Sequence, residues 1–555
     1  MTFLRQIFTE PKRLMPVIPL ALSCYVIFST FSRPGITADG QTYLQIARNL
    51  HFGIGLGWQA LWVPPFHSIL VALAGWAPGV PDLLMASAIV GAVMGIVLTG
   101  VVWLLAEELF GRSVALGASV IAALFPHFLW ISKAPEAECT YTALLVCSLW
   151  LFCIALRKQS RGTFILSGIA FSFAYMARSE GFLILLFVIA ATVFAEWRGD
   201  GRWCMARCIA MLIMAFFLSS LPYLLFLRKH YDAWVISPKS TYVLIWMKSR
   251  IYHDNDLGEV GNEELWGLTG SGKLKWQVPS GIGDVASYLM SHPAKSVRVY
   301  SDNLVRELPG KIPNNSGMEH YPQVFPVALA LAAIFASFRK WGERSYVKKA
   351  AFLSPFLILL ILPVFTEGWW KYLVPYAPLL IILGCAGIFF AAELLLKRFS
   401  HPSWRAASIA VMVLLAVYFR LKAFPLHVFA ARENKSGVAV SQPSAAIKSR
   451  QAYAVDAENA GRWIAQTLGP GHNFMVPWSK LIYHLNGLWT ATPVAEYPQL
   501  HAFALSQGAE FFLVEMDSSV PVEQIKATPP GLAFVTMYRS PQSDYTVAVY
   551  RFTPL

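Results

Sequence analysis

Residues 14–50 read LMPVIPLALSCYVIFSTFSRPGITADGQTYLQIARNL, and this stretch joins an apolar segment to a lone acid. Leu14 to Phe31 is long enough and apolar enough to cross the ~30 Å hydrocarbon core of a bilayer. Asp39 follows at the outer mouth of the membrane, where a carboxylate is costly to desolvate and is usually retained for chemistry or ion handling. The stretch therefore predicts a membrane protein and makes Asp39 the candidate catalytic residue.

The composition of the whole chain agrees with a membrane protein. Apolar residues make up 56% of the 555 positions and charged residues only 14%, whereas soluble domains carry about 25% charged residues. Apolar segments long enough to cross a bilayer recur along most of the chain. We predict an α-helical polytopic membrane protein of about eleven spans, at residues 14–31, 83–106, 114–131, 140–156, 163–177, 182–195, 208–227, 323–338, 350–366, 373–396 and 406–420.

The distribution of charge predicts which side of the membrane each loop faces. With the N-terminus in the cytoplasm, the cytoplasmic segments hold eighteen Lys and Arg against six Asp and Glu. The long outer loop 228–322 holds eleven basic and ten acidic residues, and the tail 421–555 holds ten and nine. Nearly all of the formal excess of +13 thus lies on one face, as the positive-inside rule requires. The cytoplasmic segments are 1–13, 107–113, 157–162, 196–207, 339–349 and 397–405.

This basic balance reports membrane topology and does not indicate a nucleic-acid partner. The topology predicts the inner membrane of a bacterium, with the outer loops facing the periplasm or the cell exterior. The segment from Val63 to Trp76 is apolar but short, and Pro64–Pro65 lies at its start. Counting it as a span would invert every later loop, so we expect it to lie in the membrane interface.

The C-terminal region has the pattern of a small extracytoplasmic α/β domain. Helical spacing runs from Ala457 to Leu468, and a second helix is expected at Leu500 to Gln507. Strands are expected at Phe474 to Val476, Phe511 to Glu515 and Tyr545 to Phe552. No Gly-x-Gly-x-x-Gly or Walker sequence supports nucleotide binding.

The predicted segments are 1–227, with seven spans and the first outer loop 32–82; 228–322, an outer loop with short helices; 323–420, with four spans; 421–455, a linker; and 456–555, the α/β domain.

Charged residues gather in the loops that this topology places on the outer side. They predict a catalytic pocket at the outer interface, and the alternative is that short loops simply carry solvated charges. The alternative weakens for the set, because Arg178-Ser179-Glu180-Gly181 and Trp369-Trp370-Lys371-Tyr372 have strongly apolar flanks. The candidates are Asp39, Arg48, Lys133, Glu136, Glu138, Arg178, Glu180, Glu367 and Lys371.

The chemistry of this layer follows from what can reach it. A lipid-anchored substrate presents its phosphate at headgroup level, where Arg and Lys are favoured partners. An acceptor hydroxyl needs a carboxylate to take its proton, and a leaving phosphate needs cations to hold its charge. Asp39 suits the first role, and Arg178 and Lys371 suit the second. Glu136 or Glu138 could orient sugar hydroxyls or hold a divalent metal ion with Asp39.

Two further groups of side chains have open interpretations. His51 and His67 could be ligands, although no His pair has metal-ligand spacing. Tryptophans near the outer mouth fit a sugar-stacking surface, and they fit an interfacial aromatic belt at least as well. These tryptophans are Trp58, Trp62, Trp76, Trp130, Trp369 and Trp370.

Five stretches form an ordered set of motifs along residues 1–400. They are Asp39-Gly-Gln-Thr-Tyr43-Leu-Gln-Ile-Ala47-Arg-Asn-Leu; Gly53-Ile-Gly55 with Pro64-Pro65-Phe-His-Ser-Ile-Leu; Leu109-Phe110-Gly111-Arg112; Gly168 to Arg178-Ser-Glu-Gly181; and Lys371-Tyr372-Leu-Val-Pro375-Tyr-Ala-Pro378. In this order they resemble the GT-C superfamily of membrane glycosyltransferases, and the first resembles that family's first-loop helix. The closest likeness is to bacterial proteins similar to dolichyl-phosphate-mannose–protein mannosyltransferases and to the aminoarabinose transferases of lipid A.

The resemblance implies that Asp39 is the general base, that the donor is a polyprenyl-phosphate sugar, and that transfer inverts the anomeric carbon at an extracytoplasmic site. Three departures stand out. Ser68 replaces a common third proline, and Lys371 replaces the usual Arg, losing the two-pronged phosphate grip. The loop before the fourth span has Glu136 and Glu138 without the usual Asp, which leaves open which of the two acids serves the site. The acceptor could be a glycan, a lipid or a protein. The candidate substrate-binding residues are Tyr43, His67, Glu136, Glu138, Arg178, Glu180 and Lys371.

Two other functions are compatible with a membrane bundle of this kind. A transporter or flippase of lipid-linked glycans is one, and a non-catalytic membrane scaffold is the other. Transporters usually carry charges near mid-bilayer on broken helices and show inverted repeats, and the sequence shows neither.

Overall fold

Contacts within the chain form two compact units whose boundaries do not follow sequence order. The first unit is Met1–Pro34, Pro64–Ser237 and Tyr288–Glu433, and the second is Gly35–Val63, Pro238–Ser287 and Asn434–Leu555. Residues Gly35–Val63 of the predicted outer loop 32–82 and the C-terminal segment from Asn434 therefore belong to one unit, whereas the rest of that loop from Pro64 on belongs to the other. The last residues of the predicted linker 421–455 are helical, because one helix runs over Ala445–Leu468. The computed structural model describes residues 15–31, 35–80, 82–196, 202–237, 241, 266–270, 272–278, 282–307, 343–358, 361, 374–396, 445–476, 481–517, 523, 526–541 and 543–554.

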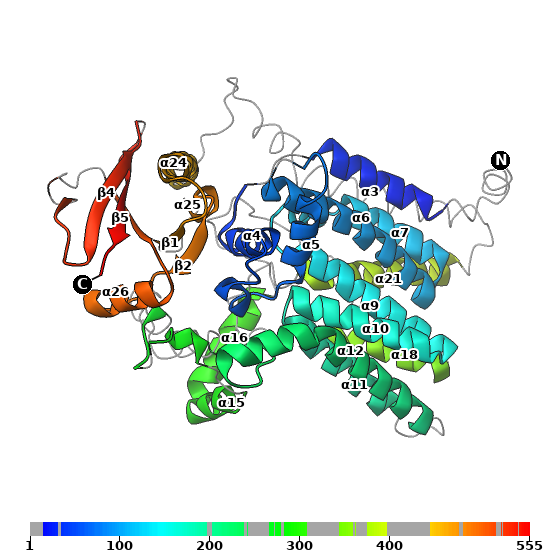
Figure 1. Ribbon diagram of the computed structural model, residues 1–555. Helices are drawn as coiled ribbons and strands as arrows, with labels where there is room; N and C mark the ends of the chain where they lie inside the picture. The colour runs from blue at the N-terminus through cyan, green and yellow to red at the C-terminus, as the bar shows by residue number, and fades with distance from the viewer. Residues whose placement is uncertain are drawn as a thin grey trace. The chain divides into compact units, whose positions relative to one another are not determined.

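The described part of the first unit is helical (Figure 1). Helix α6 packs on α7 and α9, α9 packs on α10, and α10 packs on α12, so that apolar faces of successive helices cover one another. Figure 1 labels α6, α9 and α10 in this bundle, where α9 contacts both of the others. The helices are α3 (Val17–Ser29), α5 (Phe66–Gly75), α6 (Leu83–Phe110), α7 (Arg112–Leu124), α8 (Pro126–Ile131), α9 (Glu138–Lys158), α10 (Arg161–Ala177), α11 (Glu180–Glu196), α12 (Arg202–Tyr231), α16 (Pro293–Glu307), α18 (Glu343–Leu353) and α21 (Ala377–Leu396), with α15 (Ile282–Ser291) at the division between units.

These helices agree with a membrane protein. Among the described residues, Leu83–Phe110, Glu138–Lys158 and Met205–Tyr231 are long and apolar enough to cross a bilayer. Helix α5 has 10 residues, about 15 Å at 1.5 Å per residue, so it is too short to cross, as expected. Predicted spans 323–338 and 406–420 lie outside the described residues, and the number of spans stays a prediction.

The predicted span 114–131 is interrupted in the structure. Helix α7 ends at Leu124, and α8 begins at Pro126. Proline has no N–H to donate to the preceding turn and disfavours the helical conformation in the residue before it. Phe125 accordingly adopts extended backbone angles, φ −69° and ψ 118°, so the expected continuous helix was wrong.

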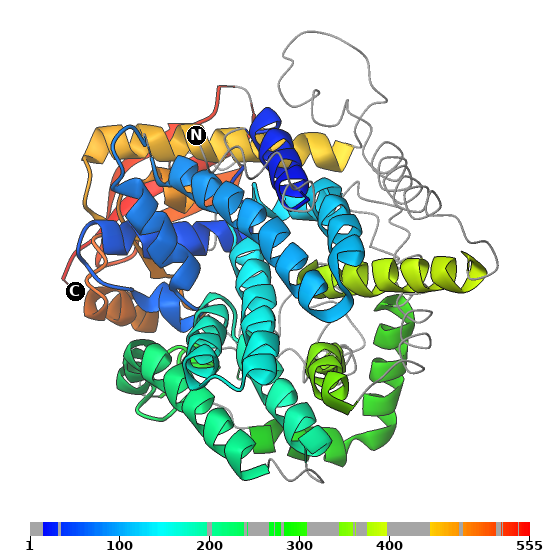
Figure 2. The same ribbon diagram turned by 90° about the vertical axis from the view of Figure 1, so that its right-hand side faces the viewer.

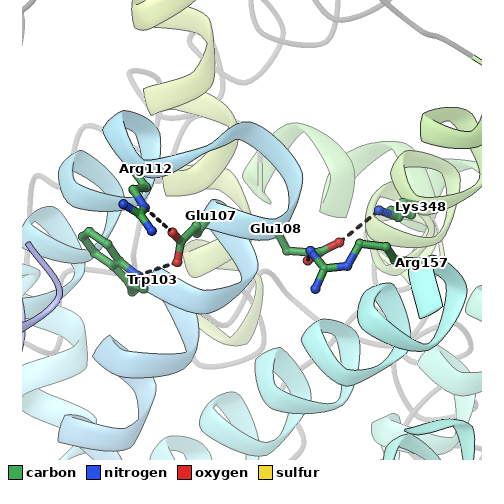
Figure 3. Close-up of polar contacts among 6 residues, drawn as sticks. All are labelled: Trp103, Glu107, Glu108, Arg112, Arg157 and Lys348. Carbon is green, nitrogen blue, oxygen red and sulfur yellow. Dashed lines mark hydrogen bonds and ion pairs between the residues drawn. The ribbon is translucent and has the colours of Figure 1, made fainter. Parts of the chain in front are cut away.

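A buried carboxylate joins three helices at one end of the bundle (Figure 3). Glu108 of α6 lies 2.7 Å from Arg157 of α9 and 2.9 Å from Lys348 of α18, and its side chain is only 4% exposed. The neighbouring Glu107 instead pairs with the exposed Arg112 at 2.8 Å. Because all these residues come from loops predicted to be cytoplasmic or from the helix ends beside them, the contacts agree with placing those loops together.

The second unit contains a five-stranded mixed sheet in the order β2-β1-β3-β5-β4. Strand β1 pairs in parallel with β2 and β3, and β5 pairs antiparallel with β3 and β4. Figure 2 shows helix α24 (Ala445–Leu468) lying across one face of the sheet, where its Ala457, Ala460 and Ile464 are buried against the strands. The strands are β1 (Asn473–Val476), β2 (Leu488–Ala491), β3 (Phe511–Asp517), β4 (Leu532–Arg539) and β5 (Tyr545–Phe552), with the helices α25 (Leu481–His484) and α26 (Tyr497–Ser506).

The same unit contains residues Gly35–Val63 of the first outer loop. It forms helix α4 (Ala38–His51) and the 3-10 helix η1 (Trp58–Leu61), and α4 contacts α25 and β2. The turn between α4 and η1 depends on glycine at position 57, where φ is +70° and a Cβ would lie 2.3 Å from the Asn49 Nδ2 atom. Gly57 therefore lets the chain turn so that η1 packs back against α4.

Candidate functional site

A buried ion cluster lies where α9, α10 and α11 meet in the first unit. Arg178 ends α10 with extended backbone angles, φ −151° and ψ 134°. One of its nitrogens, Nη1, donates to Glu138 Oε1 at the start of α9, and Nη2 donates to Glu180 Oε1 at 2.9 Å at the start of α11. The Arg178 and Glu138 side chains are 7% and 3% exposed. The cluster therefore ties together the ends of three helices.

The Arg-Ser-Glu-Gly sequence explains how these ends come so close. A Cβ at Gly181 would lie 2.7 Å from the Tyr175 backbone nitrogen and 2.9 Å from the Ala174 carbonyl carbon. Only glycine lets the first turn of α11 approach the last turn of α10 this closely. The motif thus supplies a cation, its carboxylate partner and the close approach that joins them.

Two tyrosines border the cluster, and sequence reasoning did not single out either. The Tyr141 ring centroid lies 6.0 Å from Arg178 Cζ, and Tyr141 follows Glu138 by three residues on the same face of α9. Tyr376, in the 3-10 helix η4 (Val374–Tyr376), is buried and interacts electrostatically with Arg178 and Glu180. Tyr141 could have been predicted from the sequence, because it follows Glu138 by three residues and so lies on the same face of the helix.

The cluster carries two carboxylates for one guanidinium. Arg178 was predicted to bind a phosphate, and the contacts above show instead that two of its nitrogens hold carboxylates. Removing one partner of a buried ion pair costs about 3–5 kcal/mol, because the other charge is left uncompensated. Arg178 thus connects the ends of α9, α10 and α11 through its ion pairs. Its binding of a phosphate stays a prediction.

His67 is buried against the same end of α9. Its Nδ1 atom lies 2.9 Å from Thr140 Oγ1, and burial lowers the pKa of His67 to about 4. The imidazole is therefore neutral near pH 7 and can exchange a hydrogen bond, but it does not supply a cation for a phosphate. Glu136 is also buried, in the turn before α9.

Asp39 lies in the first turn of α4 in the second unit and is partly exposed. The helix is capped by Thr37, whose Oγ1 accepts a hydrogen bond from the Gly40 N–H at 2.9 Å. The N-terminus of a helix carries a partial positive charge that favours a carboxylate there. Tyr43, one turn later, is 5% exposed and packs into the interior. Local structure thus presents Asp39 at a fixed helix terminus.

The predicted site residues fall into three sets. Arg178 contacts both Glu138 and Glu180, and their place in a catalytic pocket stays a prediction. Asp39 and Tyr43 belong to the other compact unit, so their convergence with Arg178 stays a prediction. Lys371, Glu367, Trp369 and Trp370 lie outside the described residues.

Within the described residues, no group of three or more His, Cys, Asp or Glu side chains is arranged to hold a metal ion. The proposed pairing of Asp39 with Glu138 at a divalent ion joins residues of different units and stays a prediction.

Trp58 and Trp62 have partners that neither sequence interpretation anticipated. The Trp58 ring lies 4.7 Å from Trp489, and the Trp62 ring stacks on Trp266 at 5.7 Å. Trp276, which is fully buried, contacts both Trp58 and Trp62. These two tryptophans therefore contribute to the packing of the second unit.

Comparison with known proteins identifies the class of fold. The family model described as Dolichyl-phosphate-mannose-protein mannosyltransferase matches residues 64–226. Among solved structures, ArnT from Cupriavidus metallidurans bound to undecaprenyl phosphate is similar, with a TM-score of 0.54 and 14% identity over 96% of this chain and 97% of that one. A comparison with proteins of curated function finds no match.

A second similar structure comes from an archaeon. The Archaeoglobus fulgidus oligosaccharyltransferase, tethered to an acceptor peptide with an NVT sequon, has a TM-score of 0.54 and 13% identity over 91% of this chain and 69% of that one. The family model and both structures agree with the resemblance that the sequence motifs carried. The chain has the GT-C fold of membrane glycosyltransferases.

Proposed function

We propose that this chain is an inverting glycosyltransferase of a bacterial inner membrane. It moves a sugar from a polyprenyl-phosphate donor to an acceptor hydroxyl on the extracytoplasmic face, with the N-terminus in the cytoplasm. The observation that carries the proposal is the place of Asp39, in the first turn of a capped helix within a GT-C fold. The similar ArnT structure contains undecaprenyl phosphate, which supports a donor of that chemistry.

The reaction needs one displacement at the anomeric carbon. The acceptor oxygen attacks that carbon as its proton passes to the Asp39 carboxylate, and a new carbon–oxygen bond forms. The bond between the anomeric carbon and the phosphate oxygen breaks, and its electron pair leaves with the polyprenyl phosphate. Lys371 is the cation that we assign to the leaving phosphate. Attack from the face opposite to the phosphate inverts the configuration.

Other polar side chains have supporting roles in this proposal. Glu136 and Glu138 orient sugar hydroxyls, or Glu138 holds a divalent ion with Asp39 if the reaction uses one. Arg178 sets the position of Glu138 through their ion pair, and a hydrogen bond from Arg178 to the donor phosphate would add to that role. His67, as a neutral group, is suited to hydrogen bonding with the sugar or with Thr140.

The test replaces one carboxylate and compares it with a matched acid. Membranes with Asp39→Asn are assayed for transfer of labelled sugar from synthetic polyprenyl-phosphate sugars to envelope acceptors. The loss of a general base should lower transfer by roughly 10²–10⁴-fold. The control is Asp82→Asn, because Asp82 caps α6 through the Met85 N–H at 2.8 Å and asparagine caps equally well.

Two outcomes would overturn the proposal. Wild-type transfer by Asp39→Asn would remove Asp39 as the base. Movement of a labelled lipid-linked glycan across vesicles by the purified protein, without sugar transfer, would favour the flippase alternative.

A further inference from the structure

The first outer loop binds one short segment of the C-terminal part of the second unit. Arg48 Nη2 donates to the Tyr483 carbonyl at 2.6 Å, and Gln45 Nε2 donates to the Gly487 carbonyl at 3.1 Å. The Trp58 indole and the Gln59 amide both donate to the Trp489 carbonyl, at 2.7 and 3.2 Å. All four donors belong to α4 or η1, and all acceptors are backbone carbonyls of residues 483–489, which we call the acceptor segment.

The acceptor segment offers these carbonyls for structural reasons. It begins at the end of α25, where the last carbonyls of a helix lack partners within the helix. It ends in β2, which is the outermost strand of the sheet on its side, so one row of its backbone groups has no neighbouring strand. The first outer loop therefore covers a helix end and a sheet edge that would otherwise be unsatisfied.

The side chains that make these contacts are buried. Gln45 and Gln59 are each 1% exposed and Arg48 is 7% exposed. The Arg48 guanidinium also lies 5.0 Å from the centre of the Tyr483 ring. Burial lowers the pKa of Arg48, which reflects the cost of removing a cation from water. Hydrogen bonds to charged groups are stronger than those between neutral groups, so losing the Arg48 contact would loosen α4.

Helix α4 connects these contacts to the proposed catalytic carboxylate. Asp39 lies nine residues before Arg48 in one uninterrupted helix, which spans about 14 Å at 1.5 Å per residue. A helix of this length moves as one body, so the contact at its C-terminal half fixes the direction of its N-terminal half. Gln45, between the two, gives a second point of attachment and prevents rotation about the first.

We propose that the C-terminal α/β part of the chain is a positioning element for Asp39, and that Arg48 and Gln45 are the positioning residues. This inference rests on the proposed function, because it takes Asp39 as the base. It assigns the α/β part a role in catalysis itself. A module that only recruits the acceptor would need no buried polar attachment to the helix that bears Asp39.

The first test measures α4 directly and needs no activity. Hydrogen–deuterium exchange is followed in peptides from residues 38–51 in the full-length wild type, Arg48→Ala, Arg48→Lys and Gln45→Ala. Loss of the contact should speed exchange of α4 about tenfold in Arg48→Ala. Arg48→Lys should lie between that variant and the wild type, because lysine keeps one charged donor but loses the planar contact with the ring. Peptides from β5 serve as an internal measure of intact folding.

The matched control is Arg462→Ala. Arg462 pairs with Glu458 at 2.6 Å on the exposed surface of α24, and an exposed pair of this kind contributes little. Exchange of α4 at the wild-type rate in Arg48→Ala would overturn the inference, and so would equal acceleration in Arg462→Ala. If Arg48→Ala does not fold, Gln45→Ala decides the question by the same measurement.

The second test separates this inference from the proposed function. Sugar transfer should show a lower kcat in Arg48→Ala with little change in KM for the donor, and Arg48→Lys should recover part of the kcat. If the proposed function is wrong, Asp39→Asn will transfer sugar at the wild-type rate, independently of the exchange measured in α4. Failure of the positioning inference appears as an unchanged kcat in Arg48→Ala while Asp39→Asn is inactive.

Discussion

Glu138 and Arg157 lie at opposite ends of helix α9, nineteen residues apart, and each belongs to a different buried ion cluster. At 1.5 Å per residue the two side chains are about 28 Å apart along the axis, which matches the ~30 Å thickness of the hydrocarbon core. Glu138 pairs with Arg178, whereas Arg157 pairs with Glu108. The bundle thus carries two polar layers that are separated by about the thickness of a hydrocarbon core.

The sidedness of these layers is open to direct labelling. In a chain whose seven cysteines are replaced, Ala77→Cys should react with an impermeant maleimide added outside intact spheroplasts, because Ala77 is exposed in the first outer loop. Arg112→Cys should react only after permeabilisation, since loop 107–113 is predicted to be cytoplasmic. The reverse pattern would invert the topology and place Asp39 on the cytosolic side.

The Arg178 cluster should be required for stability. Arg178→Ala leaves Glu138 buried without its partner and should lower the free energy of unfolding by about 3–5 kcal/mol, measured by denaturant titration in detergent. Glu180→Gln should cost less, because the Glu180 side chain is 25% exposed and water screens its charge. An Arg178→Ala protein as stable as the wild type would contradict the structural role.

Arg178→Lys separates fastening from phosphate binding. Lysine keeps the charge at this position but cannot donate to two partners in the fixed fork of a guanidinium. If Arg178 also binds the donor phosphate, this variant should retain most of the stability but lose sugar transfer, with an increase in KM for the donor. Equal and small losses of stability and of sugar transfer would mean that Arg178 has a structural role only.

The Glu108 cluster should hold α18 on the bundle. Glu108→Gln removes the charge that Arg157 and Lys348 share and should lower stability by about 1.5–3 kcal/mol, the scale of hydrogen bonds to charged groups. Hydrogen exchange in residues 343–353 should quicken. Glu107→Gln is the matched control, because its partner Arg112 is 53% exposed and the pair is worth at most about 1 kcal/mol. Equal losses of stability in the two variants would contradict the prediction that Glu108 holds α18 on the bundle.

The buried His67 makes stability depend on pH. Its pKa is about 4 in the folded protein and about 6.5 when exposed, so below pH 6.5 the unfolded chain binds more protons than the folded one. Stability should therefore be full above about pH 6.5 and should fall as the pH falls toward 4. Between pH 7 and pH 5, His67 should account for about 2 kcal/mol of this loss.

His67→Asn tests that share, because asparagine does not titrate and can still exchange a hydrogen bond with Thr140. The variant should lose about 2 kcal/mol less than the wild type between pH 7 and pH 5, measured by the same titration. An identical pH dependence of the two proteins would contradict the prediction.

Sequence reasoning predicted the elements that have a strong local pattern. Long apolar runs predicted helices such as α6 and α9, and helical spacing followed by Gly469 predicted the end of α24. The alternation from Tyr545 to Phe552 predicted β5 correctly. The strands β2 and β4 were missed, because neither of their sequences, LWTA and LAFVTMYR, alternates apolar and polar residues along its length.

The candidate site was predicted in part. The order of short outer loops was enough to associate Glu138, Arg178 and Glu180, because each loop joins neighbouring helices. The packing of α4 on the acceptor segment had no comparable signal. It joins Arg48 to a backbone carbonyl 435 residues later, and a carbonyl is the same whatever side chain it belongs to. Such a contact depends on tertiary structure alone.

That separation also has a consequence for biogenesis. Ribosomes add about 5–20 residues per second, so Arg48 leaves the ribosome roughly 20 to 90 s before Tyr483 is made. During this time α4 has no acceptor segment to bind, and the guanidinium group of Arg48 must remain hydrated. A nascent chain that stops before residue 483 would keep its loop unfastened, so that completing translation is itself the step that brings the first loop into its final conformation.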